Sequence, residues 1–394
     1  MENILNMAKI LFVQESHGES SEVFLYRLSS EINIFDIEVL TGRCVNIDNF
    51  PVDKYKLTLW SDSVTILEKF NSFINRKLKL KGPVVSQSKN ILSSIEKSNA
   101  DLVCFQFGFL AAMIGNDIFK IKNHICIIHH GTDINMALEN KPYLNRLKVV
   151  WKKAKKIIFV SKFLMDVAIS LGCPKEKSSV IYLGVPIKNN KIKSTSQCDS
   201  KNNFKFVCVG RMVPVKNHIN LLRAFSKVVH ESHEAPTLIL IGDGELRGLI
   251  QKEVEHLGIK NNIQLLGSLS NEEVYNIFTL SNCVVLVSKI HIKKGETRQE
   301  EGLPISLLEG ASCGLPMIGS KTGGIPEIID EGVNGFLVDP LDVDAIKNAM
   351  IYMIENREEA CEMGKNAKRS VIEKFDYKKQ TMEYEKAFLN IIKE

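Results

Sequence analysis

The sequence predicts an α/β protein made of two doubly wound parallel sheets, one in each half of the chain. Short apolar, β-branched runs alternate with amphipathic helical stretches through residues 8–184, and the alternation restarts at residue 204. This pattern is typical of parallel sheets covered by helices on both faces. Between the two series lies a polar segment without apolar periodicity, residues 188–203, which we interpret as a linker. The 394 residues are enough for two domains, each with its own core.

The elements follow in order along the chain. The strands expected in the first half are 8–14, 35–42, 100–107, 124–131, 155–162 and 178–184. Those expected in the second half are 204–210, 236–244, 263–268, 283–289, 315–321 and 335–338. We therefore expect an N-terminal Rossmann-like domain at 1–187, a C-terminal one at 204–376, and a final helix at 377–394 that can pack back on the N-terminal domain. Doubly wound sheets bind ligands at the carboxyl ends of their strands, so two such domains facing across a cleft would hold a ligand between them.

Composition narrows the class of protein. The chain is 44% hydrophobic and 25% charged, which excludes a mostly disordered, collagen-like or coiled-coil protein. No apolar run approaches the roughly 18 residues of a membrane-spanning helix, and the start of the chain does not resemble a signal peptide. Nine scattered cysteines without C-x-x-C or zinc-type spacing indicate a reducing compartment. We expect a cytoplasmic protein.

The positive charge is concentrated in the first half of the chain. Residues 1–200 carry 27 Lys and Arg against 19 Asp and Glu, whereas the remainder carries 24 against 27. The basic clusters are 76–82 and 151–156. They are interpreted either as a solvated surface or as a site for an anionic membrane surface or acceptor, which would make the protein peripheral on the inner face of the membrane. No basic stripe interleaved with aromatics supports a nucleic-acid partner.

The stretch EEGLPISLLEGASCGLP, residues 300–316, predicts a ligand site. Pro304 suits the first turn of a helix and Gly314 suits its C-terminus. The unpaired N–H groups at such a helix start attract an anion. Glu301 lies just before the helix and Glu309 lies roughly 7 Å along its axis, so two carboxylates can contact two ends of one elongated ligand. Carboxylates accept well from vicinal hydroxyls, which favours a nucleotide sugar.

These motifs resemble the retaining glycosyltransferases of the two-Rossmann GT-B architecture, in the group 1 or family four type marked by E-x7-E followed by G-G-I-P-E. The resemblance covers most of residues 100–390 and is closest to exopolysaccharide and lipopolysaccharide glycosyltransferases. The segments that carry it are HHGTDI (129–134), FVSKFLMDVAISLGCP (159–174), LGVPI (183–187), VGRMVPVKNHINLLRAF (209–225), IGDGELR (241–247) and the whole of residues 300–340.

The resemblance implies roles for the residues around E-x7-E. Glu309 would hold the ribose hydroxyls and Glu301 the hydroxyls of the donor sugar, helped by the backbone N–H groups of Gly302 and Leu303. Arg211 and Lys216 match the basic pair that neutralises the diphosphate. The chemistry supports this pair independently, because two cations offset the charge that grows on the leaving group.

Further positions are implied in both domains. His130 matches the histidine near the donor phosphate or transferred sugar, with a structural histidine as the alternative; its neighbour His129 is expected to pack in the core. We also expect the glycines Gly18, Gly242 and Gly267 to border the donor. The first loop departs from relatives that carry a Gly-Gly pair, since this chain has only Gly18 there.

The expected activity is retaining, metal-independent transfer of a hexose, most simply from a UDP-sugar, to a hydroxyl of a growing, lipid-linked or cell-surface glycan. No cofactor is implied, because the nucleotide sugar is a substrate. Asp342 and Asp344 form a D-x-D pair, but it opens an amphipathic helix, which favours Asp342 as the N-cap and Asp344 in the first turn over a metal site. A nucleotide-sugar epimerase or hydrolase, or a non-catalytic nucleotide-sugar-binding protein, are the alternatives.

Two loops allow two interpretations each. The glycines of TGGIPEII, residues 322–329, permit either a close approach of the backbone to the donor or to the facing domain, or a tight strand-to-helix turn with positive φ. The charged loop 288–300 could order over the donor or remain a solvated surface.

Overall fold

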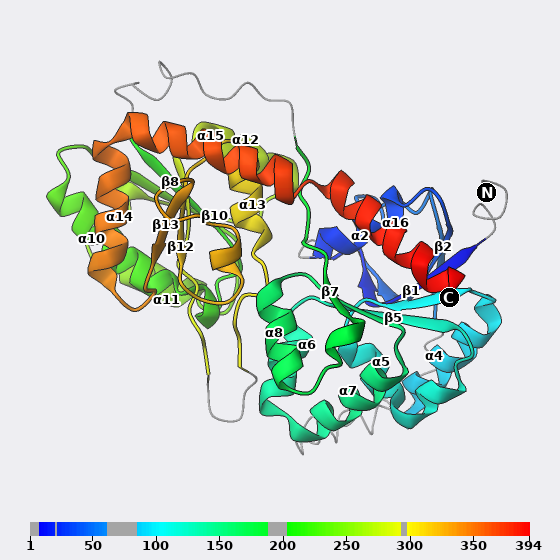
Figure 1. Ribbon diagram of the computed structural model, residues 1–394. Coiled ribbons are helices and arrows are strands. Elements are labelled where there is room, and N and C mark those ends of the chain that lie inside the picture. The colour runs from blue at the N-terminus through cyan, green and yellow to red at the C-terminus, as the bar shows by residue number, and fades with distance from the viewer. Residues whose placement is uncertain (1–7, 20–21, 61–84, 188–202, 293–297) are drawn as a thin grey trace. The chain divides into compact units, whose positions relative to one another are not determined.

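The structure is a computed structural model that describes residues 8–19, 22–60, 85–187, 203–292 and 298–394 (Figure 1). The chain divides into two compact units. The first comprises Met1–Val160, Leu164–Ile181 and Thr381–Glu394, and the second comprises Ser161–Phe163 and Tyr182–Gln380. Residues 188–202 of the expected linker and the basic cluster 76–82 lie outside the described residues.

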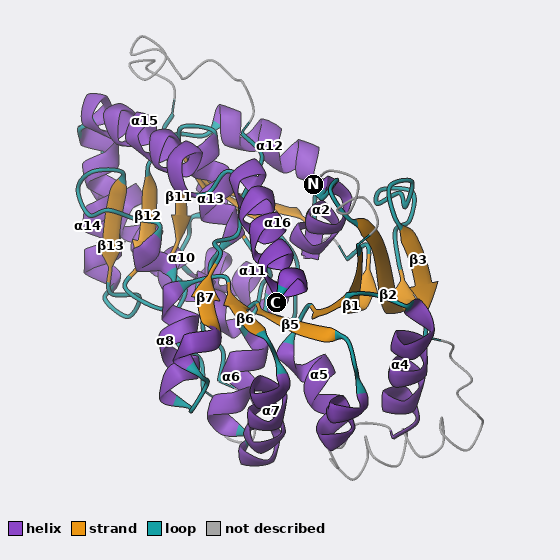
Figure 2. Cartoon of the chain, turned by 45° about the vertical axis from the view of Figure 1, so that its right-hand side comes forward, coloured by secondary structure: helices purple, strands orange, loops and turns teal. Residues whose placement is uncertain are grey.

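The first unit is built on one parallel seven-stranded sheet with the order β3-β2-β1-β4-β5-β6-β7. The strands are β1 (Lys9–His17), β2 (Asp36–Cys44), β3 (Lys56–Leu59), β4 (Leu102–Phe105), β5 (His124–His129), β6 (Lys156–Phe159) and β7 (Ser178–Val180). The helices are α2 (Val23–Glu31), α4 (Val85–Ser98), α5 (Gly108–Ile114), α6 (Thr132–Glu139), α7 (Lys141–Lys153) and α8 (Lys162–Ser170), whose first two residues belong to the second unit. Figure 2 shows β1, β2 and β3 side by side at one end of this sheet.

The last helix, α16 (Tyr377–Lys393), contributes to the core of the first unit. Tyr384 and Phe388 are fully buried on it. The Phe388 ring meets Phe12 of β1 edge-on at 6.0 Å and Phe35 at 6.4 Å. Because Phe388 packs against β1 and the neighbouring Phe35, residues 381–394 are part of this unit although they follow the second one in sequence.

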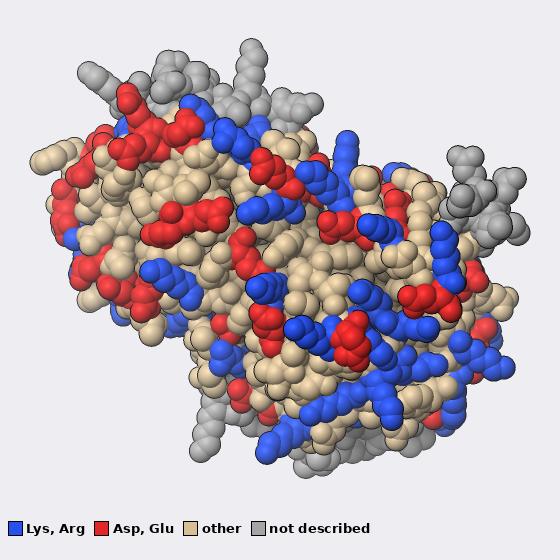
Figure 3. Space-filling view, viewed as in Figure 1, with Lys and Arg blue, Asp and Glu red and all other residues tan. Residues whose placement is uncertain are grey.

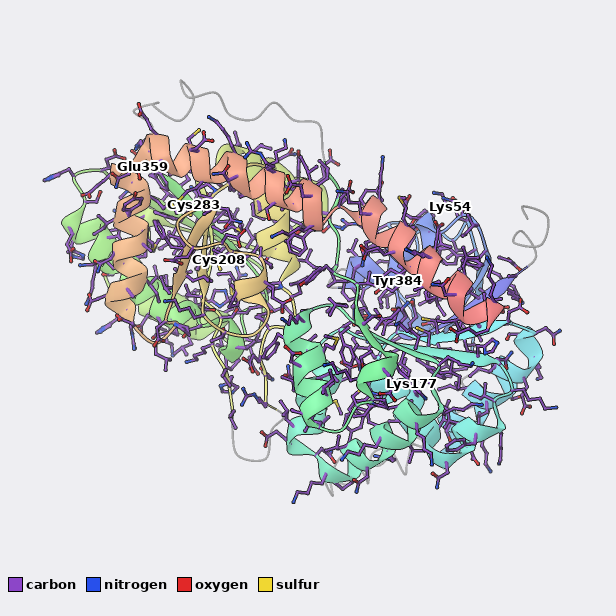
Figure 4. The ribbon with its side chains drawn as sticks, in the orientation of Figure 1. Lys54, Lys177, Cys208, Cys283, Glu359 and Tyr384 are labelled. Atoms are coloured by element: carbon purple, nitrogen blue, oxygen red, sulfur yellow. The ribbon has the colours of Figure 1, made fainter. Side chains whose placement is uncertain are left out.

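The second unit is built on a parallel six-stranded sheet with the order β10-β9-β8-β11-β12-β13. The strands are β8 (Lys205–Val209), β9 (Thr237–Ile241), β10 (Ile263–Gly267), β11 (Cys283–Leu286), β12 (Met317–Ser320) and β13 (Gly335–Val338). The helices are α10 (His218–Glu231), α11 (Arg247–His256), α12 (Asn271–Leu280), α13 (Ile305–Ser312), α14 (Val343–Glu355) and α15 (Arg357–Lys374). Cys208 and Cys283 are free, buried thiols of its adjacent strands β8 and β11 (Figure 4).

The predicted fold class is confirmed, because both sheets are parallel and doubly wound. In each one the chain starts near the middle, at β1 or β8, moves to one edge, and returns to the other side. The sequence missed β3, a four-residue strand at the edge of its sheet, and it ended β1 and β2 too early. Within the described residues, no helix combines the length and apolar character needed to span a membrane.

Candidate active site

An ion pair lies at the carboxyl edge of the second sheet. Lys216 follows β8 in a short 3-10 turn, η4 (Pro214–Lys216), and its Nζ is 2.6 Å from Oε1 of Glu301. The Ser288 hydroxyl, just after β11, donates to the same oxygen at 3.0 Å. The Lys216 and Glu301 side chains are only 15% and 13% exposed. Two residues expected to bind different parts of one donor are therefore in direct contact.

Asn217 holds the turn that presents Lys216. Its backbone is left-handed, with φ 56° and ψ 32°, a conformation that asparagine tolerates better than most residues. Its side-chain Nδ2 donates to Val287 O at 3.1 Å and to Pro340 O at 2.8 Å. The next residue, His218, is neutral near pH 7 because its burial, and secondarily the charge of Lys216, lowers its pKa to about 4. Sequence reasoning missed Asn217, whose only signal is an asparagine directly before a helix.

Two glycines allow a neighbouring loop to touch the Glu301 backbone. A Cβ on Gly323, whose φ is +58°, would lie 2.2 Å from Glu301 O, and one on Gly324 would lie 2.0 Å from Gly302 O. The Gly324 N–H donates to Glu301 O at 3.1 Å, and the Gly323 N–H donates to Oε1 of Glu300 at 3.1 Å. The glycines therefore make the expected turn, with positive φ at Gly323, and they approach the backbone of residues 301–302 of the same unit closely. Their approach to the donor or to the first domain stays a prediction.

Helix α13 begins at Ile305, one residue later than predicted. Pro304 is its N-cap, with an extended backbone of φ −78° and ψ 109°, so the expectation that Pro304 lies in the first turn is wrong by one position. Gly302 and Leu303 are buried immediately before it. Glu309 is the fifth residue of the helix and partly exposed. The helix ends at Ser312 with Cys313 as its C-cap, and Gly314 follows, as expected for a glycine at a helix C-terminus; its φ of +81° allows the Leu315 N–H to reach Gly310 O.

The remaining candidates of the second unit lie at the carboxyl ends of three adjacent strands. Arg211 is exposed just after β8. Gly242 follows β9 with φ +132°, and a Cβ there would meet Gly210 O at 2.1 Å. Its N–H donates at 2.8 Å to the carbonyl of Gly267, the last residue of β10. The close backbone packing among these loops leaves no space for a side chain at position 242, which explains the glycine there.

Glu327 anchors the same loop from its other end; it is the last residue of the G-G-I-P-E motif, but no role was predicted for it from the sequence. It ends η6 (Ile325–Glu327), and its carboxylate accepts the N–H groups of Lys162 and Phe163 at 2.8 and 2.7 Å. It also accepts the Tyr182 hydroxyl at 2.9 Å, and all these residues belong to the second unit. Three hydrogen bonds to one carboxylate fix the loop that carries Gly323 and Gly324.

In the first unit, His130 lies between two aromatic rings just after β5. Ring centroids of Phe24 and Phe107 are 4.7 and 4.8 Å away. Its Nε2 is 3.1 Å from Oε1 of Gln106. Burial, opposed weakly by Asp133, lowers the pKa of His130 to about 3, so the imidazole is neutral at physiological pH.

The preceding histidine packs in the core, as expected. His129 is fully buried, with Nδ1 2.5 Å from Oδ2 of Asp133 and Nε2 accepting from Trp151 Nε1 at 3.0 Å. Asp133 also accepts N–H groups of Gly108, Gly131 and Ile134. Burial raises the pKa of Asp133, but its interactions with His129 and these N–H groups lower it overall, to about 2. This cluster fixes the turn between β5 and α6 on which His130 lies.

Gly18 follows β1 in the first unit. Its φ is +84°, and a Cβ there would lie 1.9 Å from Val45 O, at the end of the neighbouring strand β2. A glycine is therefore needed at position 18 because the backbones at the ends of β1 and β2 leave no space for a side chain. Gly18 and His130 are in one unit, whereas the other candidate residues are in the second.

Asp342 of the D-x-D pair is the N-cap of α14 and Asp344 lies in its first turn, as predicted. Oδ1 of Asp342 accepts the N–H groups of Asp344 and Ala345 at 3.0 and 2.9 Å, and Asp344 pairs with Lys227 at 2.7 Å. Among the described residues there is no group of three or more His, Cys, Asp or Glu that could hold a metal.

In the charged loop, His291 and Gln299 pair through their backbones, and residues 293–297 lie outside the described part.

Two family models match the sequence of this chain. The model described as "Glycosyl transferases group 1" matches residues 190–370, and the model described as "Glycosyltransferase Family 4" matches residues 49–189. The two matches adjoin and together cover most of the chain, including every candidate residue except Gly18.

Individual relatives are also glycosyltransferases. N-acetyl-alpha-D-glucosaminyl L-malate synthase of Bacillus anthracis is 25% identical over 308 residues, which are 76% of this chain and 77% of that protein. A UDP-Gal:alpha-D-GlcNAc-diphosphoundecaprenol alpha-1,3-galactosyltransferase of Escherichia coli is 27% identical over 195 residues, 49% of this chain and 47% of that one.

The solved structures show the fold. HepE of Anabaena, in complex with UDP and glucose, superimposes with a TM-score of 0.77 over 97% of this chain and 100% of that one, at 19% identity. With family models that match both halves of the chain and a relative matched over about three quarters of its length, the protein belongs to the glycosyltransferases of group 1 and family four, with the GT-B architecture.

Proposed function

We propose that this glycosyltransferase moves a hexose from a UDP-sugar to a hydroxyl of a growing, lipid-linked glycan with retention of the anomeric configuration. The observation that carries the proposal is the Lys216–Glu301 pair, held at the carboxyl edge of a parallel sheet just before the start of α13. Ligands of doubly wound sheets bind at that edge. HepE was solved with UDP and glucose and one relative uses UDP-Gal, whereas GDP-mannose-dependent mannosyltransferases of mycobacteria also match, so the proposed UDP is tested against GDP in the donor titration.

The donor would lie along α13. Glu309 would accept the ribose hydroxyls and Glu301 those of the sugar, with the N–H groups of Gly302 and Leu303 beside it. Because Lys216 is bound to Glu301, one cation would both orient the sugar-binding carboxylate and face the diphosphate. Arg211 is exposed and free to close on the phosphates. Gly242 and Gly267 would border the nucleotide through their backbones.

The first unit would supply His130 and Gly18. The neutral imidazole of His130 fits a contact with a sugar hydroxyl better than with a phosphate, since a neutral ring gives an anion no charge compensation. The acceptor hydroxyl would attack the anomeric carbon as its bond to the phosphate oxygen breaks. The leaving phosphate would take the acceptor's proton on the same face, so no side-chain nucleophile is required.

We also propose that the reaction needs neither metal nor cofactor. Charge grows on the diphosphate as the glycosidic bond breaks, and two cations with the N–H groups at a helix start can offset it. Transfer should therefore continue in excess EDTA. Loss of turnover in EDTA that is restored by a divalent cation would contradict this part of the proposal.

The mutational test uses Lys216→Ala and Glu309→Ala. Each should abolish transfer and leave a folded protein, whereas Lys260→Ala and Glu255→Ala, on exposed positions of the same unit, should transfer at the wild-type rate. Near-wild-type turnover in both site variants would contradict the site assignment. Product analysis separates the other chemistries, because only a transferase consumes donor and acceptor in equal amounts.

Exposed lysines of the first unit form a basic surface on the acceptor side. Lys148, Lys152, Lys155 and Lys175 are exposed on the first unit, and Figure 3 shows Lys and Arg side chains gathered over this part of its surface. Lys177, labelled in Figure 4, donates to Lys152 O at 2.8 Å and joins the two segments. We propose that this surface contacts anionic lipid, where the lipid-linked acceptor would be found. This proposal supposes a cytoplasmic protein.

Vesicle binding tests the membrane contact. Sedimentation with phosphatidylglycerol vesicles should fall as salt rises, because the attraction is screened within about 10 Å at 0.1 M. A Lys148→Glu/Lys152→Glu variant should lose binding, while Lys252→Glu/Lys260→Glu, an equal charge change on the second unit, should not. Equal binding by both variants, or binding that salt does not affect, would refute this surface.

A further inference from the structure

His129 and His130 are adjacent in sequence, but their partners require opposite tautomers. Trp151 Nε1–H can only donate, so Nε2 of His129 is an acceptor and its proton is on Nδ1, facing Asp133. In the structure the side-chain carbonyl oxygen of Gln106 faces Nε2 of His130, and because an oxygen can only accept, this orientation puts the proton on Nε2; the Gln106 Nε2 is, like His130 Nδ1, buried without a hydrogen-bond partner. His130 Nδ1 is therefore a hydrogen-bond acceptor.

That acceptor has no partner in the described part of the chain. His130 Nδ1 is among the buried side-chain atoms without a hydrogen bond. An unsatisfied buried polar atom usually costs about 1–3 kcal/mol, so such atoms in native proteins require an explanation. A bound ligand that donates a hydrogen bond at this point would remove the cost.

The position in the fold agrees with ligand binding. Gln106 directly follows β4, is fully buried, and is fixed by its own N–H, which donates to Val13 O of β1 at 2.9 Å. The order β3-β2-β1-β4 reverses between β1 and β4, which is the topological switch point of the first sheet. Doubly wound sheets bind ligands at that point. Gln106 and His130 are thus next to the expected ligand site of this unit.

We propose that Gln106 is a positioning residue that holds His130 in the Nε2–H tautomer, so that Nδ1 accepts a hydrogen bond from a hydroxyl of the bound sugar. The proposal rests on the proposed function, which gives His130 a sugar contact. It adds the direction of that hydrogen bond and the residue that sets it. A phosphate oxygen, which carries no proton at neutral pH, would not satisfy this nitrogen.

Long-range 1H–15N NMR of the histidine side chains tests the tautomer without any substrate. The His130 signals are assigned by comparison with His130→Asn. Wild-type protein should show Nε2–H for His130 and Nδ1–H for His129. Gln106→Met, which keeps the side-chain length but removes the acceptor, should abolish the preference at His130 and leave His129 unchanged as an internal control. A His130 protonated on Nδ1, or a tautomer unaffected by Gln106→Met, would overturn the proposal.

Kinetics test the use of that nitrogen. Gln106→Met should lower kcat/KM for transfer by roughly tenfold, about the value of one hydrogen bond to substrate. Gln106→Glu keeps an acceptor beside Nε2 and should stay within about threefold of wild type above pH 8. A tautomer change without any change in transfer would overturn the positioning role while leaving the Gln106–His130 geometry intact.

Gln106→Glu also provides a pH signature and a second variant if Gln106→Met does not fold. The new carboxylate should raise the pKa of His130, adding to the effect of Asp133 and opposing that of burial and of His129. An acid limb should then appear in the pH profile of kcat/KM, because a protonated Nδ1 cannot accept. A pH profile identical to wild type, with an unshifted His130 resonance, would contradict the contact between residues 106 and 130.

Discussion

Replacing Gly324 by alanine tests whether backbone packing in the second unit positions Glu301. A Cβ at this position would be 2.0 Å from Gly302 O, whereas real Cβ contacts under 3.0 Å are essentially never observed. The backbone at Gly324, with φ −84° and ψ 1°, is allowed for alanine, so the conflict is one of space alone. The 301–302 segment must therefore move by about 1 Å or more.

That displacement has a predictable kinetic cost. A misplacement of about 1 Å near a reacting centre can lower the rate by about 10²-fold. Overpacking of a buried contact usually costs about 1–3 kcal/mol of stability. We therefore expect Gly324→Ala to fold, with a lower unfolding midpoint, and to lose about 100-fold in kcat/KM for transfer.

The control is Gly248→Ala in α11. A Cβ at Gly248 would meet nothing within 4 Å, and alanine in a helix is more favourable than glycine by up to about 1 kcal/mol. This variant should be as stable as wild type or more so and should transfer normally. Both proteins are assayed by product formation from radiolabelled donor, with unfolding followed by circular dichroism. Wild-type transfer by a folded Gly324→Ala would refute the reasoning.

Other predictions follow from single contacts. Lys216→Met leaves the little-exposed Glu301 carboxylate without its cation and should lower the free energy of unfolding in urea by about 1–3 kcal/mol. The double variant Lys216→Met/Glu301→Gln should recover part of that stability but no activity. Stability losses of the single variants that simply add in the double variant would exclude a coupling between the two residues. The pKa of Asp133 is about 2 in the folded protein, below its usual value, so this carboxylate adds to the free energy of unfolding above about pH 4 and loses that contribution as the pH falls towards 2. Asp133→Asn should therefore flatten the dependence of the unfolding free energy on pH in this range. An unchanged slope of unfolding free energy against pH would contradict this prediction. Glu327→Ala should lower the unfolding free energy by about 1–2 kcal/mol and reduce transfer, and full activity would show that its loop needs no anchor.

Most of the fold was predictable because its signals are local. The apolar strands and the amphipathic helix 377–393 repeat at the periods of buried strands and surface helices, and parallel sheets follow from their alternation. Strand β3 was not predicted because a strand of four residues at the edge of a sheet is too short and too exposed to show a clear hydrophobic pattern. The N-cap role of Asp342 was predictable for the same reason, since a cap acts on the next three residues.

The contacts of the site were harder to predict because they join distant segments. Lys216 and Glu301 are 85 positions apart, and only the folded loops after β8 and β11 show that they pair. Asn217 and Gln106 gave little signal, since isolated polar residues at the ends of elements are common in loops, and Glu327 was named only as the last residue of the G-G-I-P-E motif, without a role. Their importance comes from what they hold in place, and that is visible only once the partner segments have been brought together.

The central claim is that the second unit binds a nucleotide-sugar donor through residues on both sides of the α13 start. Calorimetric titration of the wild-type protein and Glu309→Ala with UDP-, GDP- and ADP-sugars, in EDTA throughout, tests it most directly. The account predicts that wild-type protein binds UDP-sugars selectively and that Glu309→Ala binds them at least tenfold more weakly. Equal affinity of the two proteins for the preferred nucleotide sugar would contradict it.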